Sequence, residues 1–161
     1  MWFFFDTSAL VKRYHEEKGT GCVDRIFDTI LSGRHRGTVS SLAILELVSA
    51  IRRKVASGEL DDKDFIDASA YFMEEVSGSF LVIPIDSVLH LDALDMVVKH
   101  ALRASDSIQL ACALKLAQTV EKSEICLVNC DQELSSAAAK EGFRIIDPQA
   151  AAMQDLNEVL K

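Results

Sequence analysis

Four acidic residues occupy places in this sequence where a carboxylate is unexpected. Asp6 ends the apolar run WFFF, and Asp131 comes three residues after the end of the apolar run ICLV. Glu46 lies inside LAILELVSAI, and Asp106 stands just before the apolar stretch SIQLACAL. If these acids meet, like charges ~4 Å apart repel by roughly 4 kcal/mol per pair at an effective dielectric of 20. Such a cluster requires protons or a cation, so we expect a metal site.

The donor types indicate which metal. The four groups offer only carboxylate oxygens, without a histidine or thiolate among them. A set of hard oxygen donors favours Mg²⁺ or Mn²⁺ over zinc. A divalent ion held by carboxylates activates water and stabilises a leaving oxygen in phosphoryl chemistry. The residues therefore predict metal-dependent phosphoryl chemistry.

Each acid also has an ordinary explanation when it is taken alone. Asp6 and Asp131 could cap the helices that follow them, because Asp is a favoured N-cap residue. Asp106 could stabilise a helix dipole from the first turn. Glu46 has no basic partner at helical spacing, but it could lie at the margin of a helix that is buried on one side. These alternatives stay open for single residues, and the combination favours a site.

Basic residues near these segments could hold phosphate groups. Lys12 and Arg13 lie on the first predicted helix, and Arg52 and Arg53 lie one to two turns after Glu46. Cations near the end of a helix can equally be partners of the helix dipole. We expect these four to bind substrate, with the dipole role as the alternative.

The elements that must position these residues alternate along the chain. Helical patterns separating apolar runs predict a parallel sheet with helices on both faces, an α/β fold. In such a sheet, ligands bind beyond the carboxyl ends of the strands. Ser40 or Ser41 is expected to cap the third helix and Ser105 the sixth. The expected strands are 2–5, 37–40, 80–85, 124–129 and 143–147, and the expected helices are 8–17, 21–33, 42–57, 65–78, 87–102, 107–120 and 133–142.

Length and composition bound the possibilities. The 161 residues, of which 49% are hydrophobic and 26% charged, predict one globular domain over 1–161, with a core of about 2–147 and a tail at 148–161 that could form a terminal helix. The four cysteines show no CxxC pair, so we expect buried free thiols in a reducing cytosol. No leader precedes the first strand and no apolar run approaches the ~18 residues of a membrane span, so we expect a cytoplasmic protein. The net charge of −8 argues against holding nucleic acid through the overall field, and any such role requires local cations.

Four stretches, taken together and in order, resemble a known family. FFFDTSALVKRY, SSLAILELVSAIRRK, LRASDSIQLACAL and VNCDQELSSAAAKEGFRII are similar to the PIN-domain nucleases, most closely the VapC toxins of toxin-antitoxin pairs. The resemblance runs from about residue 2 to residue 147. It implies a three-layer α/β/α sandwich with a mostly parallel central sheet, and a Mg²⁺- or Mn²⁺-dependent endoribonuclease.

The resemblance also assigns residues. Asp6, Glu46 and Asp106 match the metal carboxylates of the family, and Asp131 matches a fourth, more peripheral acid. Ser8 matches a hydroxyl near the metal waters. Asn129 departs from the pattern, because the family usually has Thr or Ser there, although an amide can still donate a hydrogen bond.

Partners follow from the same resemblance. VapC toxins form homodimers, and an antitoxin with apolar and basic groups inhibits them. The net charge of −8 is compatible with a basic inhibitor. One alternative is a PIN domain that binds RNA or a partner without cutting, and another is an RNA-processing nuclease that is not a toxin. A receiver domain or an Asp-x-Asp phosphatase fits less well, because a single acid ends the first strand and Ser8 stands where the second Asp would be.

Overall fold

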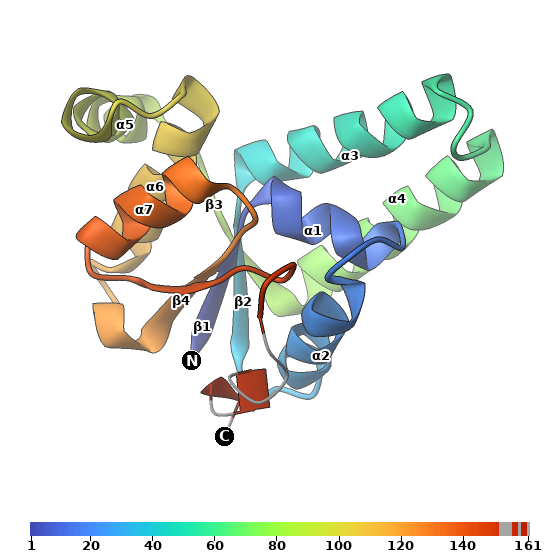
Figure 1. Cartoon of the computed structure of the whole chain (residues 1–161), viewed down its shortest axis with the longest axis horizontal. Helices are drawn as coiled ribbons and strands as arrows, with labels where there is room; N and C mark the ends of the chain where they lie inside the picture. The colour runs from blue at the N-terminus through green and yellow to red at the C-terminus, as the bar shows by residue number, and fades with distance from the viewer. Residues whose placement is uncertain (152–155, 158, 161) are drawn as a thin grey trace.

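Five parallel strands form the centre of the molecule, in the order β3-β2-β1-β4-β5 (Figure 1). The structure is a computed structural model that describes residues 1–151, 156, 157, 159 and 160. All five predicted strands are present. They are β1 (Trp2–Phe5), β2 (Arg36–Ser40), β3 (Phe80–Ile83), β4 (Ile125–Val128) and β5 (Arg144–Ile146).

The first strand is the central one. Phe5 pairs with Val39 of β2 on one side and with Val128 of β4 on the other. The chain builds the sheet outward from β1 to β2 and β3, and then crosses to β4 and β5 on the opposite side. The strand order therefore reverses beside β1, and such a switch point opens a crevice at the carboxyl ends of the strands.

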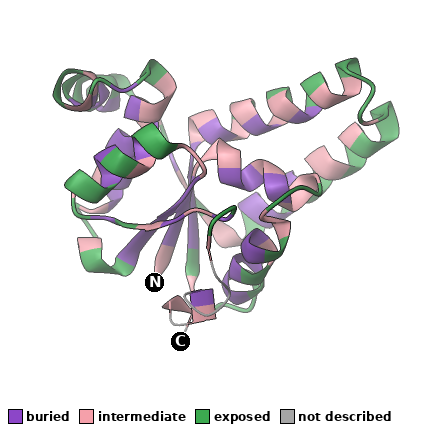
Figure 2. Cartoon of the chain, in the orientation of Figure 1, coloured by how far each residue is buried: buried purple, intermediate pink, exposed green. Residues whose placement is uncertain are grey.

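Helices cover both faces of the sheet, which confirms the predicted α/β/α sandwich. Phe3 and Phe5 of β1 pack into one core and Phe4 into another, because successive side chains of a strand point to opposite faces. Figure 2 shows the buried residues concentrated on the strands and the inner sides of the helices. The first core involves α1 (Thr7–Tyr14), α2 (Thr20–Leu31), α3 (Ser41–Ala56) and α4 (Asp62–Ser79), and the second involves α5 (Ser87–His100), α6 (Ala104–Leu116) and α7 (Gln132–Lys140).

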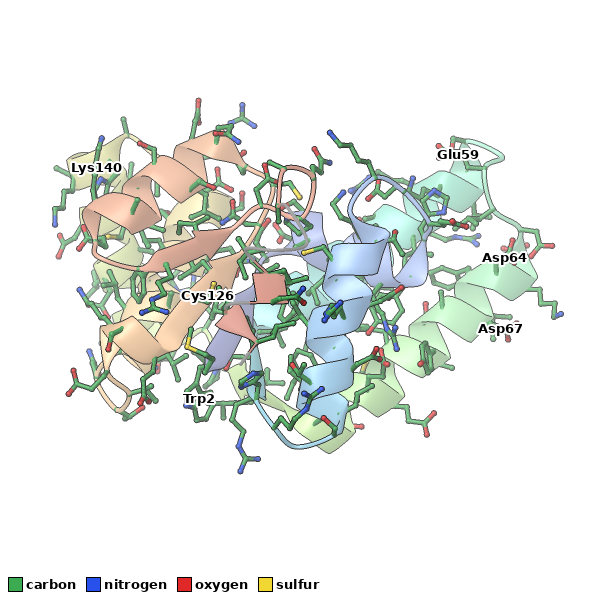
Figure 3. The ribbon with its side chains drawn as sticks, turned by 60° about the horizontal axis from the view of Figure 1, so that its bottom comes forward. Trp2, Glu59, Asp64, Asp67, Cys126 and Lys140 are labelled. Carbon is green, nitrogen blue, oxygen red and sulfur yellow. The ribbon has the colours of Figure 1, made fainter. Side chains whose placement is uncertain are left out.

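The α3–α4 hairpin projects beyond the sheet on one side (Figure 1). Its far end is acidic, and Figure 3 shows Glu59, Asp64 and Asp67 there, away from Trp2 and Cys126 of the sheet. Asp61 and Asp64 form a capping box at the start of α4. That pair explains why the helix begins at Asp62, three residues before the predicted start.

Other boundaries also differ from the predictions. Helix α1 ends at Tyr14 rather than at residue 17, because His15 is extended and Glu17 folds back to pair with Lys12. Part of the predicted terminal helix over 148–161 lies outside the described residues. Within the described residues, none of the helices combines the length and hydropathy that crossing a membrane requires.

Candidate active site

A cavity of about 470 Å³ opens at the carboxyl edge of the sheet, beside the switch point. The structure brings all four acids to it: Asp6 from the end of β1, Glu46 from α3, Asp106 from α6 and Asp131 from the loop after β4. The lining residues are Asp6, Thr7, Ser8, Leu45, Glu46, Ser49, Arg53, Ser105, Asp106 and Asp131.

Asp6 and Asp131 each cap a helix while lining the cavity. Oδ2 of Asp6 accepts a hydrogen bond from the backbone N–H of Ser8 at 2.9 Å, and Oδ1 of Asp131 accepts one from Leu134 at 2.9 Å. The backbone N–H of Asp6 also donates to the carbonyl of Val128, which fixes Asp6 between β1 and β4. Each carboxylate keeps a second oxygen without a hydrogen bond to the described residues. Capping and ligation are therefore compatible in one residue.

Asp106 has a carboxylate oxygen that is buried without a partner among the described residues. Its Oδ1 accepts a hydrogen bond from the Ser105 hydroxyl at 3.3 Å, and its buried Oδ2 has no partner among the described residues. Burial raises the pKa of Asp106, and the negative charges of Asp131 and Asp6 raise it further.

The start of α6 differs from the prediction. Arg103 rather than Ser105 is the N-cap, without a side-chain hydrogen bond, so Ser105 lies in the first turn.

Glu46 is held by two residues that the sequence did not single out. The hydroxyl of Thr7 donates to Oε2 of Glu46 at 2.6 Å, and Nε2 of Gln109 approaches the same oxygen at 3.4 Å. Thr7 is 39 and Gln109 is 63 positions away from Glu46 along the chain, so neither contact follows from local spacing.

Ser8 and Asn129 organise the loop that carries Asp131. The Ser8 hydroxyl accepts a hydrogen bond from the backbone N–H of Cys130 at 2.9 Å. Oδ1 of Asn129 accepts from the N–H of Asp131 at 3.1 Å and from the Ser135 hydroxyl at 2.9 Å. The sequence suggested that this amide donates, but its buried Nδ2 has no partner in the described chain.

Three of the four predicted phosphate-binding cations are engaged elsewhere. Lys12 is only 2% exposed and pairs with Glu17, and Arg13 pairs with Glu75 and Asp24. These are structural ion pairs, and neither cation lines the cavity.

The two arginines of α3 differ although they are adjacent. Arg52 pairs with Asp62 and lies over the ring of Phe65, whereas Arg53 lines the cavity and donates to the Ser49 hydroxyl. Of the predicted cations, the structure thus brings Arg53 alone to the acids.

Arg103 is a cation that the sequence reasoning missed. It is exposed, makes no ion pair with another described residue, and its positive charge lowers the pKa of Asp106. Its place immediately before α6 is the signal that could have identified it, because that position adjoins the first-turn acid.

The donor chemistry of the cavity suits a hard divalent cation. Two buried acceptors without a partner among the described residues lie in or behind it, namely Oδ2 of Asp106 and Oε1 of Gln109, and unpaired acceptors near a carboxylate cluster are what a cation or its water would satisfy. As they stand, however, no three His, Cys, Asp or Glu side chains of the described residues are placed to hold an ion together. The carboxylates share the cavity and would have to close in around a metal.

Comparisons with known proteins identify the fold. A family model described as the PIN domain matches residues 3–140 of the chain. A search of curated proteins finds no match.

Several solved structures resemble most of the chain. PAE2754 from Pyrobaculum aerophilum has 19% sequence identity and a TM-score of 0.63, and the match covers 99% of this chain and 89% of that one. VapC20 of Mycobacterium tuberculosis, described as a toxin that cleaves the sarcin-ricin loop, has 16% identity and a TM-score of 0.62, covering 84% and 94%. A toxin-antitoxin complex from Klebsiella pneumoniae has 13% identity and a TM-score of 0.60, covering 90% and 96%. At identities this low, the similarities establish the fold.

Proposed function

The chain belongs to the PIN domain family, and on this premise we propose that it is a Mg²⁺- or Mn²⁺-dependent endoribonuclease that hydrolyses RNA phosphodiester bonds. PIN domains are generally nucleases, which supports a hydrolase. The observation that carries the proposal is the convergence of Asp6, Glu46, Asp106 and Asp131 on one cavity at the switch point of the sheet.

We propose a role for each residue that lines or adjoins the cavity. Asp6, Glu46 and Asp106 would hold the ion directly or through water, and Asp131 would orient water or a second ion. A bound ion would supply Lewis acidity that activates water and stabilises the leaving oxygen. Arg53 lines the same cavity and would hold a substrate phosphate beside the acids. Ser8 and Asn129 keep the Asp131 loop in place through their hydrogen bonds.

We further propose that the nuclease is the toxin of a toxin-antitoxin pair that acts in the cytoplasm. Structural similarity to toxin-antitoxin proteins supports this assignment. A basic antitoxin segment would be attracted to the net charge of −8, and the acidic end of the α3–α4 hairpin is one place where that charge gathers. The free cysteines fit a reducing compartment.

We also propose that the chain pairs with a second copy of itself as a homodimer. Helix α5 has two apolar faces: Leu89, Ala93 and Met96 are buried in the core, whereas an opposite stripe is exposed. An exposed apolar stripe marks an interaction surface. These side chains suit a second copy, because a symmetric contact between two identical apolar stripes needs no complementary charge. This α5 stripe consists of Val88, Leu91, Leu94 and Val98.

The decisive experiment is RNA cleavage by the purified protein in the presence of Mn²⁺, with and without EDTA. D6N should abolish cleavage and leave the fold intact, because Asn is also a good helix cap. D28N, which changes an exposed acid of α2, is the matched control and should cleave normally. Unchanged cleavage by D6N would exclude the mechanism, and wild-type RNA binding without cleavage would favour the non-cutting alternative.

The toxin assignment has its own test. Expression of the wild type should arrest growth, D6N should not, and a small adjacent reading frame should relieve the arrest. Cleavage without growth arrest would favour an RNA-processing nuclease.

A further inference from the structure

Glu46 is held from both sides of the sheet. Thr7 belongs to α1, which covers the same face as α3, whereas Gln109 belongs to α6 on the opposite face. Both side chains donate to Oε2 of Glu46, at 2.6 Å and 3.4 Å. Oε1 makes no hydrogen bond to a described residue, so it is the oxygen left for the cavity.

Gln109 is an unusual residue for its position. Its side chain is fully buried, and it lies one helical turn after Asp106 on α6, behind the cavity. Its Oε1 is buried without a partner among the described residues. A half-satisfied buried amide destabilises the fold, and a Leu or Met of similar size would avoid that cost. The hydrogen bond to Glu46 explains why a Gln rather than an apolar residue occupies this position.

We propose that Thr7 and Gln109 are positioning residues that fix the Glu46 carboxylate, so that Oε2 is restrained and Oε1 is presented to the metal site. The assignment rests on the proposed function for the identity of the site. The two donors restrict the rotamers of a flexible side chain before any cation arrives, which lowers the cost of assembling the site.

The first test is structural and requires no metal. In crystals of the metal-free wild type, Glu46 should occupy one rotamer, with Oε2 within hydrogen-bond distance of both donors. T7V and Q109M remove one donor each at nearly constant volume, and Glu46 should then occupy several rotamers. T7S keeps the hydroxyl and should restore the single rotamer. T38V is the matched control, because Thr38 is a buried β2 residue whose hydroxyl lacks a partner among the described residues.

The second test is Mn²⁺ affinity measured by calorimetry. T7V and Q109M should each weaken binding about tenfold, as loss of a group that orients a ligand commonly does, whereas T7S and T38V should bind as the wild type does. In an E46A background, T7V should have no further effect, because Thr7 acts through Glu46. A purely structural role would leave the T7V effect intact in that background.

The outcomes separate this proposal from the proposed function. If Glu46 keeps one rotamer in both T7V and Q109M, the positioning role is wrong whether or not the protein cleaves RNA. If Q109M does not fold, T7V decides alone, because Thr7 is only partly buried at the edge of the cavity. If the wild type neither binds Mn²⁺ nor cleaves RNA while Glu46 is fixed as described, the proposed function fails and the positioning contacts stand.

Discussion

Arg52 and Arg53 are neighbours in sequence, but their guanidinium groups serve different purposes. Arg53 lines the acidic cavity, and Arg52 lies over Phe65 and pairs with Asp62. Replacing Arg53 with Ala should raise the KM for RNA roughly tenfold with a smaller change in kcat, since a charge-assisted hydrogen bond contributes about 1.5–3 kcal/mol. R52A is the matched control and should leave KM within about twofold.

Ionic strength distinguishes this role from a change in folding. The KM of the wild type should rise with salt more steeply than that of R53A, because the variant has lost one phosphate contact. Equal KM values for R53A and R52A would show that Arg53 does not bind the substrate.

At the scale of single residues, the sequence identifies the acids because their surroundings are anomalous. Asp6 and Glu46 are notable within apolar segments, and that signal is local. Thr7 and Gln109 have no such signal, because a Thr in a first helical turn and a Gln in a helix are ordinary residues. For Lys12 the residue type suggests a phosphate ligand, but its charge is paired with that of Glu17 in the folded chain. Contacts of this kind depend on tertiary structure.

The end of α5 is attached to the end of α7 by one carboxylate. Glu141, immediately after α7, lies 2.6 Å from Lys99 and 2.6 Å from His100, and it is 10% exposed. The hydrogen bond from Lys99 lowers the pKa of Glu141 below its ordinary value of 4.5, with His100 adding to the effect against burial. A carboxylate with a lowered pKa stabilises the fold above its unfolded pKa, and this contribution disappears as pH falls through the folded value.

We therefore expect E141Q to be less stable than the wild type at pH 7, by about 1 kcal/mol. This corresponds to a Tm lower by roughly 2–4 °C. The difference should shrink as the pH falls below about 4.5 and Glu141 in the wild type takes up its proton. Thermal melts from pH 3 to pH 7 measure it. E133Q, which changes an exposed acid of α7, should show no such trend, and a constant difference for E141Q would contradict the linkage.

At the scale of elements, periodicity predicts which segments are helices and strands, whereas the exact ends depend on capping and on tertiary contacts. The predicted strand at 37–40 corresponds to β2 beside the central strand. Helix α4 begins early because Asp61 and Asp64 cap each other. Helix α6 begins at Ala104 without a side-chain cap, so no cap residue could have marked its start.

At the scale of the whole molecule, the layers follow from the alternation of elements, but the strand order does not. Alternating strands and helices require a parallel sheet with two covered faces. Nothing local specifies that β4 returns to pair with β1 rather than extending the sheet from β3. Because that crossing creates the crevice between β1 and β4, the meeting of Asp6 with Asp131 is a property of the topology.

The α5 stripe leads to a prediction about the assembly. Val98 is 80% exposed and Leu91 is 66% exposed, so neither contributes much to the core of its own chain. Replacing Val98 with Glu should therefore leave the Tm of an isolated chain nearly unchanged. It should convert a dimer into a monomer, since an unpaired charge within an apolar interface costs several kcal/mol. Sedimentation at micromolar concentration measures the mass of each species.

A matched control separates the stripe from surface hydrophobicity in general. Ile66 of α4 is 62% exposed and lies outside the stripe, so I66E removes a similar apolar group at a different surface and should remain dimeric. The same mass for the wild type and V98E would exclude the stripe as the dimer interface. Dissociation of both V98E and I66E would place the second copy across α4 as well. With V98E monomeric and I66E dimeric, two copies pair through α5, because a symmetric contact between identical stripes needs no complementary charge.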